Sequence, residues 1–400
     1  MITADTYYPA VSGVARFVRQ LSEGLSRRGH EVHLVVPSWV GEPATTMTEG
    51  VTVHGVRSYR LLPGRPVLRL SGRGAARSAV AALLNQLSPA LVHINGQHLI
   101  GRAALVAAEA AGVPVLATNH FMPENVVDEF PMPRFVRRRC VRWLWSDTGR
   151  ALLRCTAVTA PTATAAQMLA ARAGIPDATA ISCGIDMSRF PEPNSVRRSG
   201  RSVLYVGRLD REKRLGDLLR AIAMAPGLEL DLIGAGRDDK ALRRLAGRLG
   251  IADRVRFRGR VSEVELLQAY AEAGVFCMPG VAELQSLATL EALAAGLPVI
   301  AADAAALPHL VRAGITGWLY PPGDVSELAR RLAETADDEP RRTAMGRAAR
   351  DLASRHALAA TLDGYEQIYR MIAGTAKVTD APIAVTSAAL RQQFGITRSS

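Results

Sequence analysis

Two glutamates separated by seven residues, Glu283 and Glu291, lie in the segment of this chain whose pattern is the most specific. A short apolar run at 275–278 indicates a strand before them, and another at 298–302 indicates a strand after them. Carboxylates only accept hydrogen bonds, and the hydroxyls of a diol donate them. Glu283 could therefore bind sugar hydroxyls, and Glu291, two helical turns further on, could hold a ribose diol. Such a pair alone is more often a solvated helix edge, but the flanking strands favour a binding site.

The residues between the two glutamates supply a possible anion site. Gln285, Ser286 and Leu287 fall where the helix expected over 286–295 should begin. The first N–H groups of a helix have no partner within it, and the helix dipole is positive at that end. A phosphate can bind there without a metal ion. We therefore expect these three residues to contact a phosphate-bearing ligand.

Two basic residues follow another expected strand, at 202–206. Gly207 closes that strand, Arg208 leaves its carboxyl end, and Lys213 follows five residues later. Two cations at one strand end can neutralise a diphosphate leaving group, as Mg²⁺ does in other enzymes. Basic residues near a strand end are often only solvated. Lys213 is, however, one of only three lysines in an arginine-rich chain, which favours a specific role slightly.

Strands and helices alternate along nearly the whole chain, and these elements must position the residues above. That alternation is typical of βαβ units with parallel sheets. In the first half we expect a helix from Val14 to Leu25, a strand at 32–36, a helix at 103–111 and a strand at 115–118. In the second half we expect strands at 202–206, 228–233, 255–258, 275–278 and 298–302, and helices at 215–224, 240–249, 263–272 and 286–295.

The length of 400 residues is too great for one ordinary domain and fits two, each with its own core. Residues 1–188 are expected to form the first domain and 202–356 the second. The segment 189–201, rich in Pro, Ser and Arg, indicates a linker. A last helix at 357–373 would cross back to the first domain, and 374–400 would be a loose tail. Ligands of open α/β sheets bind outside the strands' carboxyl ends, so we expect the site in a cleft between the domains.

The segments VGRLDREK at 206–213 and VAELQSLATLEALAAGLPVIA at 281–301 together resemble the family-4 retaining glycosyltransferases. The resemblance spans approximately residues 1–372 and is strongest over 200–325. It implies an α/β protein of the GT-B fold, with two facing Rossmann-like domains of doubly wound parallel sheet and an interdomain cleft.

The resemblance also implies roles for individual residues. Glu283 would contact the transferred sugar and Glu291 the ribose, while Arg208 and Lys213 would bind the pyrophosphate. Three further residues would lie near the base of the donor: Gly234, Arg258 and Val261. Base contacts in such enzymes are often made by backbone.

Two residues of the first half match the same family. Family members place a histidine against the donor sugar at the end of the strand expected at 115–118, and His120 matches it; the alternative is a structural histidine. Gly13 resembles the glycine of a loop that approaches the donor phosphates, where only glycine lets the backbone come so close. The chain departs from the family in its first strand, which has only Met1 to Ala4 before this loop. Either translation starts further upstream, or this strand is truncated and the first domain weakened.

The mechanism is an expectation from the resemblance. No carboxylate is clearly placed as a covalent nucleophile, so we expect front-face attack in which the departing phosphate takes the acceptor proton. No Asp-x-Asp motif and no CxxC pair occur, so neither a metal ion nor another cofactor is expected beside the nucleotide sugar, a UDP- or GDP-hexose. His93 and His98 are five residues apart without a third ligand, and they are expected to line the cleft or the acceptor side.

Arginine clusters twice in the first half of a chain whose net charge is +12. The first cluster contains Arg57, Arg60, Arg65, Arg69, Arg73 and Arg77. The second contains Arg134, Arg137, Arg138, Arg139 and Arg142, beside Trp143 and Trp145. Basic amphipathic segments with tryptophan bind anionic membrane surfaces, although a solvated helix face with its tryptophans in the core is an alternative. Nucleic acid is not expected, because aromatic stacking platforms interleaved with base-reading residues are missing.

The expected location is the cytoplasm, peripheral to the inner face of the cell membrane, because no secretory signal and no membrane-spanning stretch is found in the sequence. The segments ELQSL and TNHFMPENV look most like the branch that glycosylates diacylglycerol-type lipids. The sequence therefore predicts transfer of a hexose of the glucose or mannose class to a membrane lipid such as diacylglycerol. The alternatives are phosphatidylinositol, a polysaccharide or a small-molecule acceptor, or else a nucleotide-sugar epimerase or a non-catalytic nucleotide-sugar-binding protein.

Overall fold

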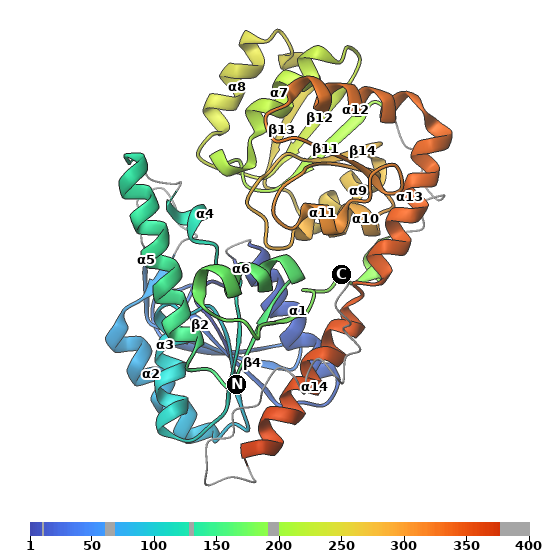
Figure 1. Ribbon diagram of the computed structural model, residues 1–400. Helices are drawn as coiled ribbons and strands as arrows, with labels where there is room; N and C mark the ends of the chain where they lie inside the picture. Colours follow the sequence, from blue (N-terminus) through green and yellow to red (C-terminus); the bar gives the residue numbers. More distant parts are fainter. Residues whose placement is uncertain (10–11, 61–68, 128–131, 191–199, 377–400) are drawn as a thin grey trace. The chain divides into compact units, whose positions relative to one another are not determined.

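A computed structural model describes residues 1–9, 12–60, 69–127, 132–190 and 200–376 of the chain (Figure 1). Most of the predicted linker at 189–201 and of the predicted tail at 374–400 therefore lies outside the described residues, as does Arg65.

The chain divides into two compact units, each made of more than one segment. Unit 1 consists of Met1–Pro123, Arg138–Ser182 and Thr361–Ser400. Unit 2 consists of Glu124–Arg137 and Cys183–Ala360. The division after Ser182 falls earlier than the boundary predicted at 188, and unit 2 includes a short segment from the first half of the chain.

Unit 1 is built on an eight-stranded sheet within the described residues, in the order β10-β9-β8-β7-β1-β2-β4-β3. All neighbours in it are parallel except β3 and β4. Its strands are β1 (Ile2–Ala4), β2 (Val32–Pro37), β3 (Ala44–Thr48), β4 (Val51–Val56), β7 (Val92–Asn95), β8 (Val115–Thr118), β9 (Ala157–Ala160) and β10 (Thr179–Ala180), and a separate antiparallel pair is β5 (Ser58–Arg60) with β6 (Arg69–Ser71). The three-residue β1 takes a central place, paired on both sides.

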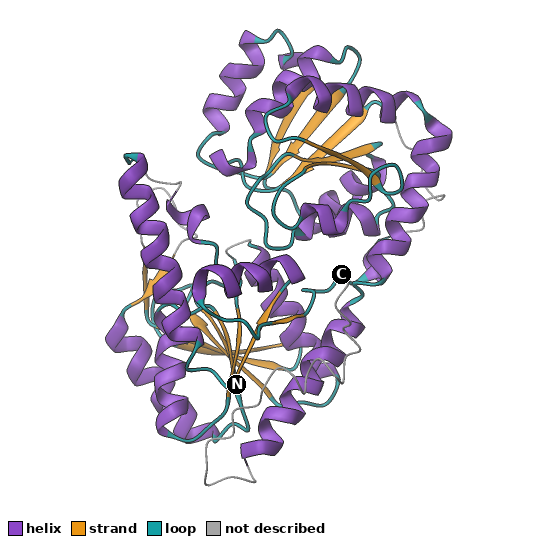
Figure 2. Ribbon diagram, viewed as in Figure 1, coloured by secondary structure: helices purple, strands orange, loops and turns teal. Residues whose placement is uncertain are grey.

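Helices accompany this sheet, as Figure 2 shows. They are α1 (Gly13–Arg27), α2 (Arg73–Leu87), α3 (Leu99–Ala110), α6 (Ala163–Ala173) and most of α5 (Arg134–Leu152) and α14 (Leu358–Ala376). The short helix α4 (Pro123–Val127) belongs to unit 2 from its second residue on. The amphipathic pattern that predicted α1 is confirmed, since Phe17, Val18 and Leu21 are buried against the sheet. Ser12 caps this helix by accepting a hydrogen bond from the backbone N–H of Ala15 at 3.1 Å.

Unit 2 is built on a parallel six-stranded sheet within the described residues, in the order β13-β12-β11-β14-β15-β16. Its strands are β11 (Ser202–Val206), β12 (Glu229–Ile233), β13 (Val255–Gly259), β14 (Val275–Met278), β15 (Val299–Ala302) and β16 (Gly317–Tyr320). Its helices are α7 (Leu215–Met224), α8 (Asp239–Arg248), α9 (Glu263–Glu272), α10 (Leu287–Ala294), α11 (Leu307–Leu310), α12 (Val325–Asp337) and α13 (Glu339–Ser354). Renumbered within the unit, this strand order is the 3-2-1-4-5-6 arrangement of a Rossmann domain.

The long helix α14 is joined to the sheet of unit 1 by a buried polar chain. His93 on β7 has its Nδ1 2.7 Å from the hydroxyl of Tyr369 and its Nε2 2.7 Å from the hydroxyl of Thr118. Thr118 in turn lies 3.2 Å from the hydroxyl of Tyr365. The prediction that His93 lines the cleft or the acceptor side is therefore wrong, since its side chain is fully buried. Its strand is buried along its whole length, and the ring serves to attach a helix.

The buried histidines of unit 1 make its stability depend on pH. Burial lowers the pKa of His93 well below its usual value, and burial lowers the pKa of His120 to about 4. In the unfolded chain these histidines have a pKa near 6.5. The unfolded chain therefore binds more protons than the folded chain once the pH falls below that value. Stability present above pH 6.5 is thus lost on acidification, by up to about 1.4 kcal/mol per pH unit for each histidine. We expect the thermal unfolding temperature to be lower at pH 5.5 than at pH 7.5, and the difference to be smaller in His93→Gln. An equal difference in the two proteins would contradict the lowered pKa of His93.

Candidate functional site

The strand order of unit 2 places a switch point between β11 and β14. The chain continues from β11 to β12 on one side, and later enters β14 on the other side. Ligands of open parallel sheets bind outside the carboxyl ends of the two strands at such a point. Arg208 and Lys213 follow β11, and Glu283 follows β14. The structure therefore brings together three of the residues that the sequence predicted to form one site.

Lys213 and Glu283 form an ion pair across this switch point. The Nζ of Lys213 lies 2.5 Å from Oε1 of Glu283, and the two side chains are only 11% and 13% exposed. Gly280 leaves room for them, because a Cβ there would lie 3.3 Å from Cδ of Lys213 and 3.5 Å from the Glu283 carboxylate. Ion pairs with so little solvent around them interact more strongly than surface pairs.

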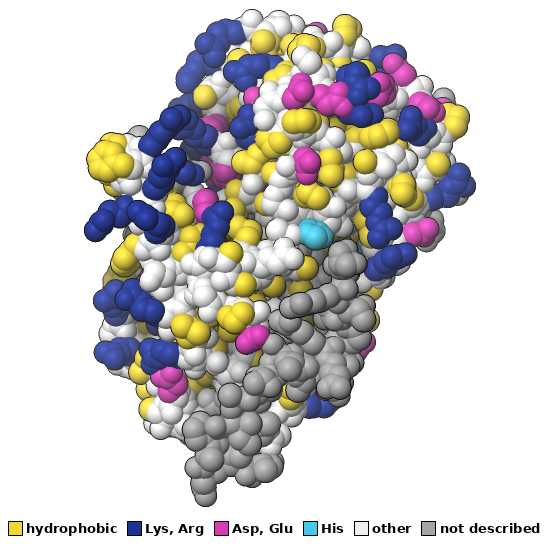
Figure 3. Space-filling view, viewed as in Figure 1, with side chains coloured by type: hydrophobic (Ala, Val, Ile, Leu, Met, Phe, Trp, Pro, Cys, Tyr) yellow, Lys and Arg dark blue, Asp and Glu magenta, His cyan; other side chains and the backbone are white. Residues whose placement is uncertain are grey.

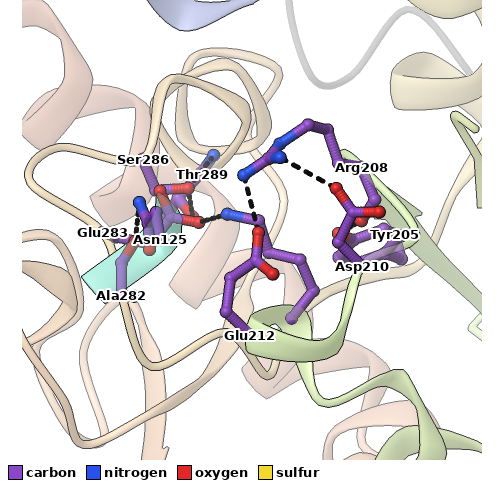
Figure 4. A network of polar contacts seen from close by, with 10 residues as sticks. Asn125, Tyr205, Arg208, Asp210, Glu212, Ala282, Glu283, Ser286 and Thr289 are labelled. Atoms are coloured by element: carbon purple, nitrogen blue, oxygen red, sulfur yellow. Dashed lines mark hydrogen bonds and ion pairs between the residues drawn. The ribbon is translucent and has the colours of Figure 1, made fainter. Parts of the chain in front are cut away.

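Arg208 is held by two carboxylates of its own loop (Figure 4). Its Nη1 donates to Oδ2 of Asp210 at 2.8 Å, and its Nη2 donates to Oε1 of Glu212 at 2.6 Å. Burial raises the pKa of the Glu212 carboxyl, and the Arg208 charge partly offsets that effect. Sequence reasoning missed Asp210 and Glu212. Both acids lie between Arg208 and Lys213 in the segment 206–213, so the sequence could have indicated them as partners of these cations.

Backbone contacts fix the two loops that carry these charges. The hydroxyl of Tyr205 donates to the carbonyl oxygen of Arg208 at 2.7 Å. The backbone N–H of Val281 donates to the carbonyl oxygen of Glu212 at 3.2 Å, which ties the loop after β14 to the loop after β11. Arg211–Lys213 forms a turn of 3₁₀-helix that brings Lys213 toward Glu283. The positions of the charged groups therefore follow from the sheet and its first turns.

Helix α10 begins where the sequence predicted. Ser286 is its N-cap and Leu287 its first residue, with the Ser286 hydroxyl accepting from the Thr289 hydroxyl at 2.8 Å. Gln285 precedes the cap, and its Oε1 accepts from the backbone N–H of Cys183 at 2.7 Å. That bond engages the Gln285 oxygen within unit 2, although the sequence predicted this side chain to bind the donor. The dipole of α10 still favours an anion at this end.

Glu291 is buried on α10, with 2% of its surface exposed. Its Oε2 accepts a hydrogen bond from the hydroxyl of Tyr270 on α9 at 2.9 Å. A carboxylate so deeply buried is retained only with hydrogen-bond partners, and Tyr270 supplies one. Tyr270 was missed by sequence reasoning, because an apolar helix face with one tyrosine gives no indication of which group its hydroxyl meets.

The three residues predicted near the base lie at or beyond the ends of β12 and β13. Gly234 follows β12 with a φ of 135°, and a Cβ on it would lie 1.8 Å from the carbonyl oxygen of Gly207. Arg258 lies in β13, with Nη1 3.9 Å from Asp231. Val261 lies just beyond that strand and packs partly buried against the core. Arg208, Gly234 and Val261 thus follow three adjacent strands of one sheet, and Arg258 lies near the end of the third.

His120 and Gly13 lie in unit 1. His120 follows β8, with Nε2 3.3 Å from Oδ1 of Asn95 at the end of β7 and its ring 4.8 Å from that of Phe17. Gly13 is the first residue of α1, directly after its cap. Their contact with a donor bound to unit 2 stays a prediction. Across the described ranges, no group of three or more His, Cys, Asp or Glu side chains is arranged to hold a metal ion.

Comparisons of the sequence with known families and proteins match both halves of the chain. Residues 187–352 match the family model described as Glycosyl transferases group 1, and residues 11–189 match Glycosyltransferase Family 4. A GDP-mannose-dependent alpha-mannosyltransferase of Mycobacterium tuberculosis is 32% identical over 83% of this chain and 85% of its own length. The sulfoquinovosyl transferase of Arabidopsis thaliana is 29% identical over 85% of this chain and 67% of its own.

Solved structures resemble the fold along most of the chain. A sucrose-phosphate synthase from Thermosynechococcus elongatus has a TM-score of 0.76 at 22% identity, over 94% of this chain and 99% of that one. Anabaena HepE in complex with UDP and glucose has a TM-score of 0.74 at 17% identity, over 92% of this chain and 99% of that one. At these identities the likeness concerns the fold, and it confirms the predicted α/β class with two Rossmann-like domains, GT-B.

Proposed function

We propose, from the premise that this chain belongs to glycosyltransferase family 4, that it moves a hexose from a nucleoside-diphosphate sugar to a membrane lipid. Family membership makes the chain a hexosyltransferase. The observation that carries the donor half is the pairing of Lys213 with Glu283, beside Arg208, at the switch point of the second sheet. The proposal that the acceptor is a membrane lipid is based on the exposed surface of helix α5.

The donor's diphosphate would bind at the carboxyl ends of β11 and β14. Arg208 and Lys213 supply positive charge there, and the N-terminus of α10 adds its dipole. Glu283 would accept hydrogen bonds from hydroxyls of the transferred hexose, and Glu291 would serve the ribose. The mannosyltransferase relative uses GDP-mannose according to its name, and Anabaena HepE holds UDP and glucose, which supports a GDP- or UDP-hexose of the mannose or glucose class.

The chemistry would need charge stabilisation more than a covalent intermediate. As the bond from the sugar to the phosphate breaks, negative charge grows on the leaving diphosphate, and fixed cations stabilise that charge in proportion to its growth. The acceptor hydroxyl would attack from the same face and pass its proton to the departing phosphate, so that the configuration of the sugar is retained. Since Arg208 and Lys213 supply the charge, we propose that the reaction needs no metal ion.

The acceptor surface would be the exposed face of α5. Phe135 and Trp143 on this helix are 74% and 60% exposed, whereas Trp145 is 2% exposed and belongs to the core. The arginines exposed on the same helix are Arg134, Arg138, Arg139, Arg142 and Arg150. In Figure 3 basic and hydrophobic side chains gather along the edge where Figure 1 draws α5. Among the described helices, none combines the length and hydrophobicity needed to span a membrane.

A flotation assay with lipid vesicles tests the acceptor half. Each arginine near an anionic surface contributes about 1 kcal/mol, so Arg138→Gln with Arg139→Gln should weaken binding to phosphatidylglycerol vesicles about 30-fold. The matched control changes two exposed arginines of α8, Arg244→Gln with Arg248→Gln, and should bind like the unaltered chain. Equal binding to anionic and neutral vesicles would contradict the lipid acceptor. A mass-spectrometric screen of nucleotide sugars against a lipid extract then identifies donor and product together.

A further inference from the structure

We propose that Glu212 is an exchangeable counter-ion of the diphosphate site. It pairs with Arg208 while no diphosphate is bound, and it takes up a proton when a diphosphate replaces it on that arginine. The inference rests on the proposed function, because it assumes that Arg208 and Lys213 bind the diphosphate of the donor.

The charges of the site require some group to change on binding. The hydrogen-bonded network contains three carboxylates, those of Asp210, Glu212 and Glu283, and two cations, Arg208 and Lys213. Its formal charge is therefore −1 when all five groups are ionised. A diphosphate brings at least two more negative charges to within a few ångströms, where unscreened repulsion is strong. Either an acid leaves the site or an acid loses its charge.

Asp210 and Glu283 can each keep their charge more readily than Glu212 when a diphosphate binds. Oδ1 of Asp210 accepts from the backbone N–H of Arg237 at 2.9 Å, independently of its bond to Arg208. Glu283 is paired with Lys213, and its side chain is 13% exposed, so water can stabilise its charge when Lys213 binds a diphosphate. Glu212 differs, since its side chain pairs with Arg208 at 2.6 Å and is the least exposed of the three acids. Its ionised form is therefore destabilised most when phosphate oxygens accept the hydrogen bonds of the Arg208 guanidinium.

The side chain of Glu212 is also held so that it cannot turn into solvent when it is displaced from Arg208. Its side chain is 4% exposed. Its carbonyl oxygen accepts from the backbone N–H of Val281 at 3.2 Å, which keeps the residue between the loops after β11 and β14. A buried carboxylate that loses its cation becomes neutral by binding a proton, because an uncompensated buried charge is costly.

The surroundings of Glu212 favour that outcome. Its charged and titratable neighbours are Arg208, Lys213 and Asp210, together with the phenol of Tyr205. Burial is the largest influence on its pKa and raises it; among the opposing influences the Arg208 charge is the largest. When Arg208 pairs with a negatively charged diphosphate instead, its charge no longer counteracts the effect of burial on the pKa of Glu212. The pKa of Glu212 therefore rises further when the site is filled.

Isothermal titration calorimetry of the full chain with GDP and with UDP measures this proton directly. At pH 8.0 the terminal phosphate of either nucleotide is already ionised, since its second pKa is about 6. The enthalpy measured in buffers of different ionisation enthalpy then gives the protons that the protein takes up, which we expect to reach up to about one per nucleotide bound. Affinity should fall by up to about tenfold per pH unit between pH 7.5 and pH 8.5.

The Glu212→Gln variant should bind nucleotide with close to no proton uptake and with an affinity that no longer depends on pH in this range. Glu212→Asp keeps an acid and should restore part of the uptake. Glu272→Gln, at an exposed glutamate of α9, is the matched control and should behave like the unaltered chain. Equal uptake with and without Glu212, or no uptake in the unaltered chain, overturns this role while nucleotide binding and the proposed function stand. Failure of both nucleotides to bind overturns the two proposals together.

Discussion

Replacing Lys213 with methionine is expected to lower kcat/KM for hexose transfer by about 10²- to 10³-fold, the usual cost of removing one preorganised charge-stabilising donor. Methionine keeps the length and the apolar stem of the side chain and removes only the charge. The same change leaves Glu283, whose side chain is 13% exposed, without its cation. A buried acid left unpaired costs about 3 kcal/mol of unfolding free energy. We therefore expect the variant to lose both activity and stability, measured by initial rates and by urea unfolding.

A double variant separates these two losses. Lys213→Met with Glu283→Gln leaves no stranded charge, so most of the lost stability should return while transfer stays as low as in the single variant. An exposed pair on α12, Arg330 and Glu334, provides the control, and the corresponding changes there should alter neither property measurably. The proposal would be wrong if the single variant kept its transfer rate, or if repairing the charge balance also repaired the rate.

The elements of unit 2 were predictable because buried parallel strands are continuous apolar runs with turn residues at their ends. The expected strands at 202–206 and 275–278 coincide with β11 and β14, and the expected helix at 263–272 coincides with α9. β3, in contrast, was not predicted, because all five of its residues are exposed and give no apolar pattern. It forms as an edge strand through its pairing with β4, which is a tertiary contact.

The location of the candidate site could be predicted from the sequence, but the pairing of its side chains could be predicted only in part. Residues that follow parallel strands meet at one edge of a sheet, so Arg208, Lys213 and Glu283 could be grouped from the sequence alone. Their pairing could not, because it depends on which side chains turn toward each other. Lys213 meets Glu283, seventy residues away in the sequence, whereas Arg208 meets acids of its own loop. His93 was misplaced for a related reason: its strand is buried on both faces, so alternation does not show which way the ring points.

Replacing Gly234 with alanine is expected to cost about 3 kcal/mol or more of unfolding free energy and to abolish most of the transfer activity. Gly234 has a φ of 135°, a conformation that residues with a Cβ rarely adopt. The new Cβ would lie 1.8 Å from the carbonyl oxygen of Gly207, so the ends of β11 and β12 would have to separate. Urea unfolding measures the first effect, and initial rates of hexose transfer measure the second.

The activity loss follows from where the separation would occur. Gly207 directly precedes Arg208, and its N–H donates to the carbonyl oxygen of Ile233 at 3.0 Å, so a shift there moves the guanidinium away from the diphosphate position. Gly247→Ala on α8 is the matched control, because it has no atom within 4 Å of the added Cβ and lies inside a helix. It should stabilise the chain by up to about 1 kcal/mol and leave transfer unchanged. If Gly234→Ala unfolded like Gly247→Ala, the close approach of β11 and β12 could not be what positions Arg208.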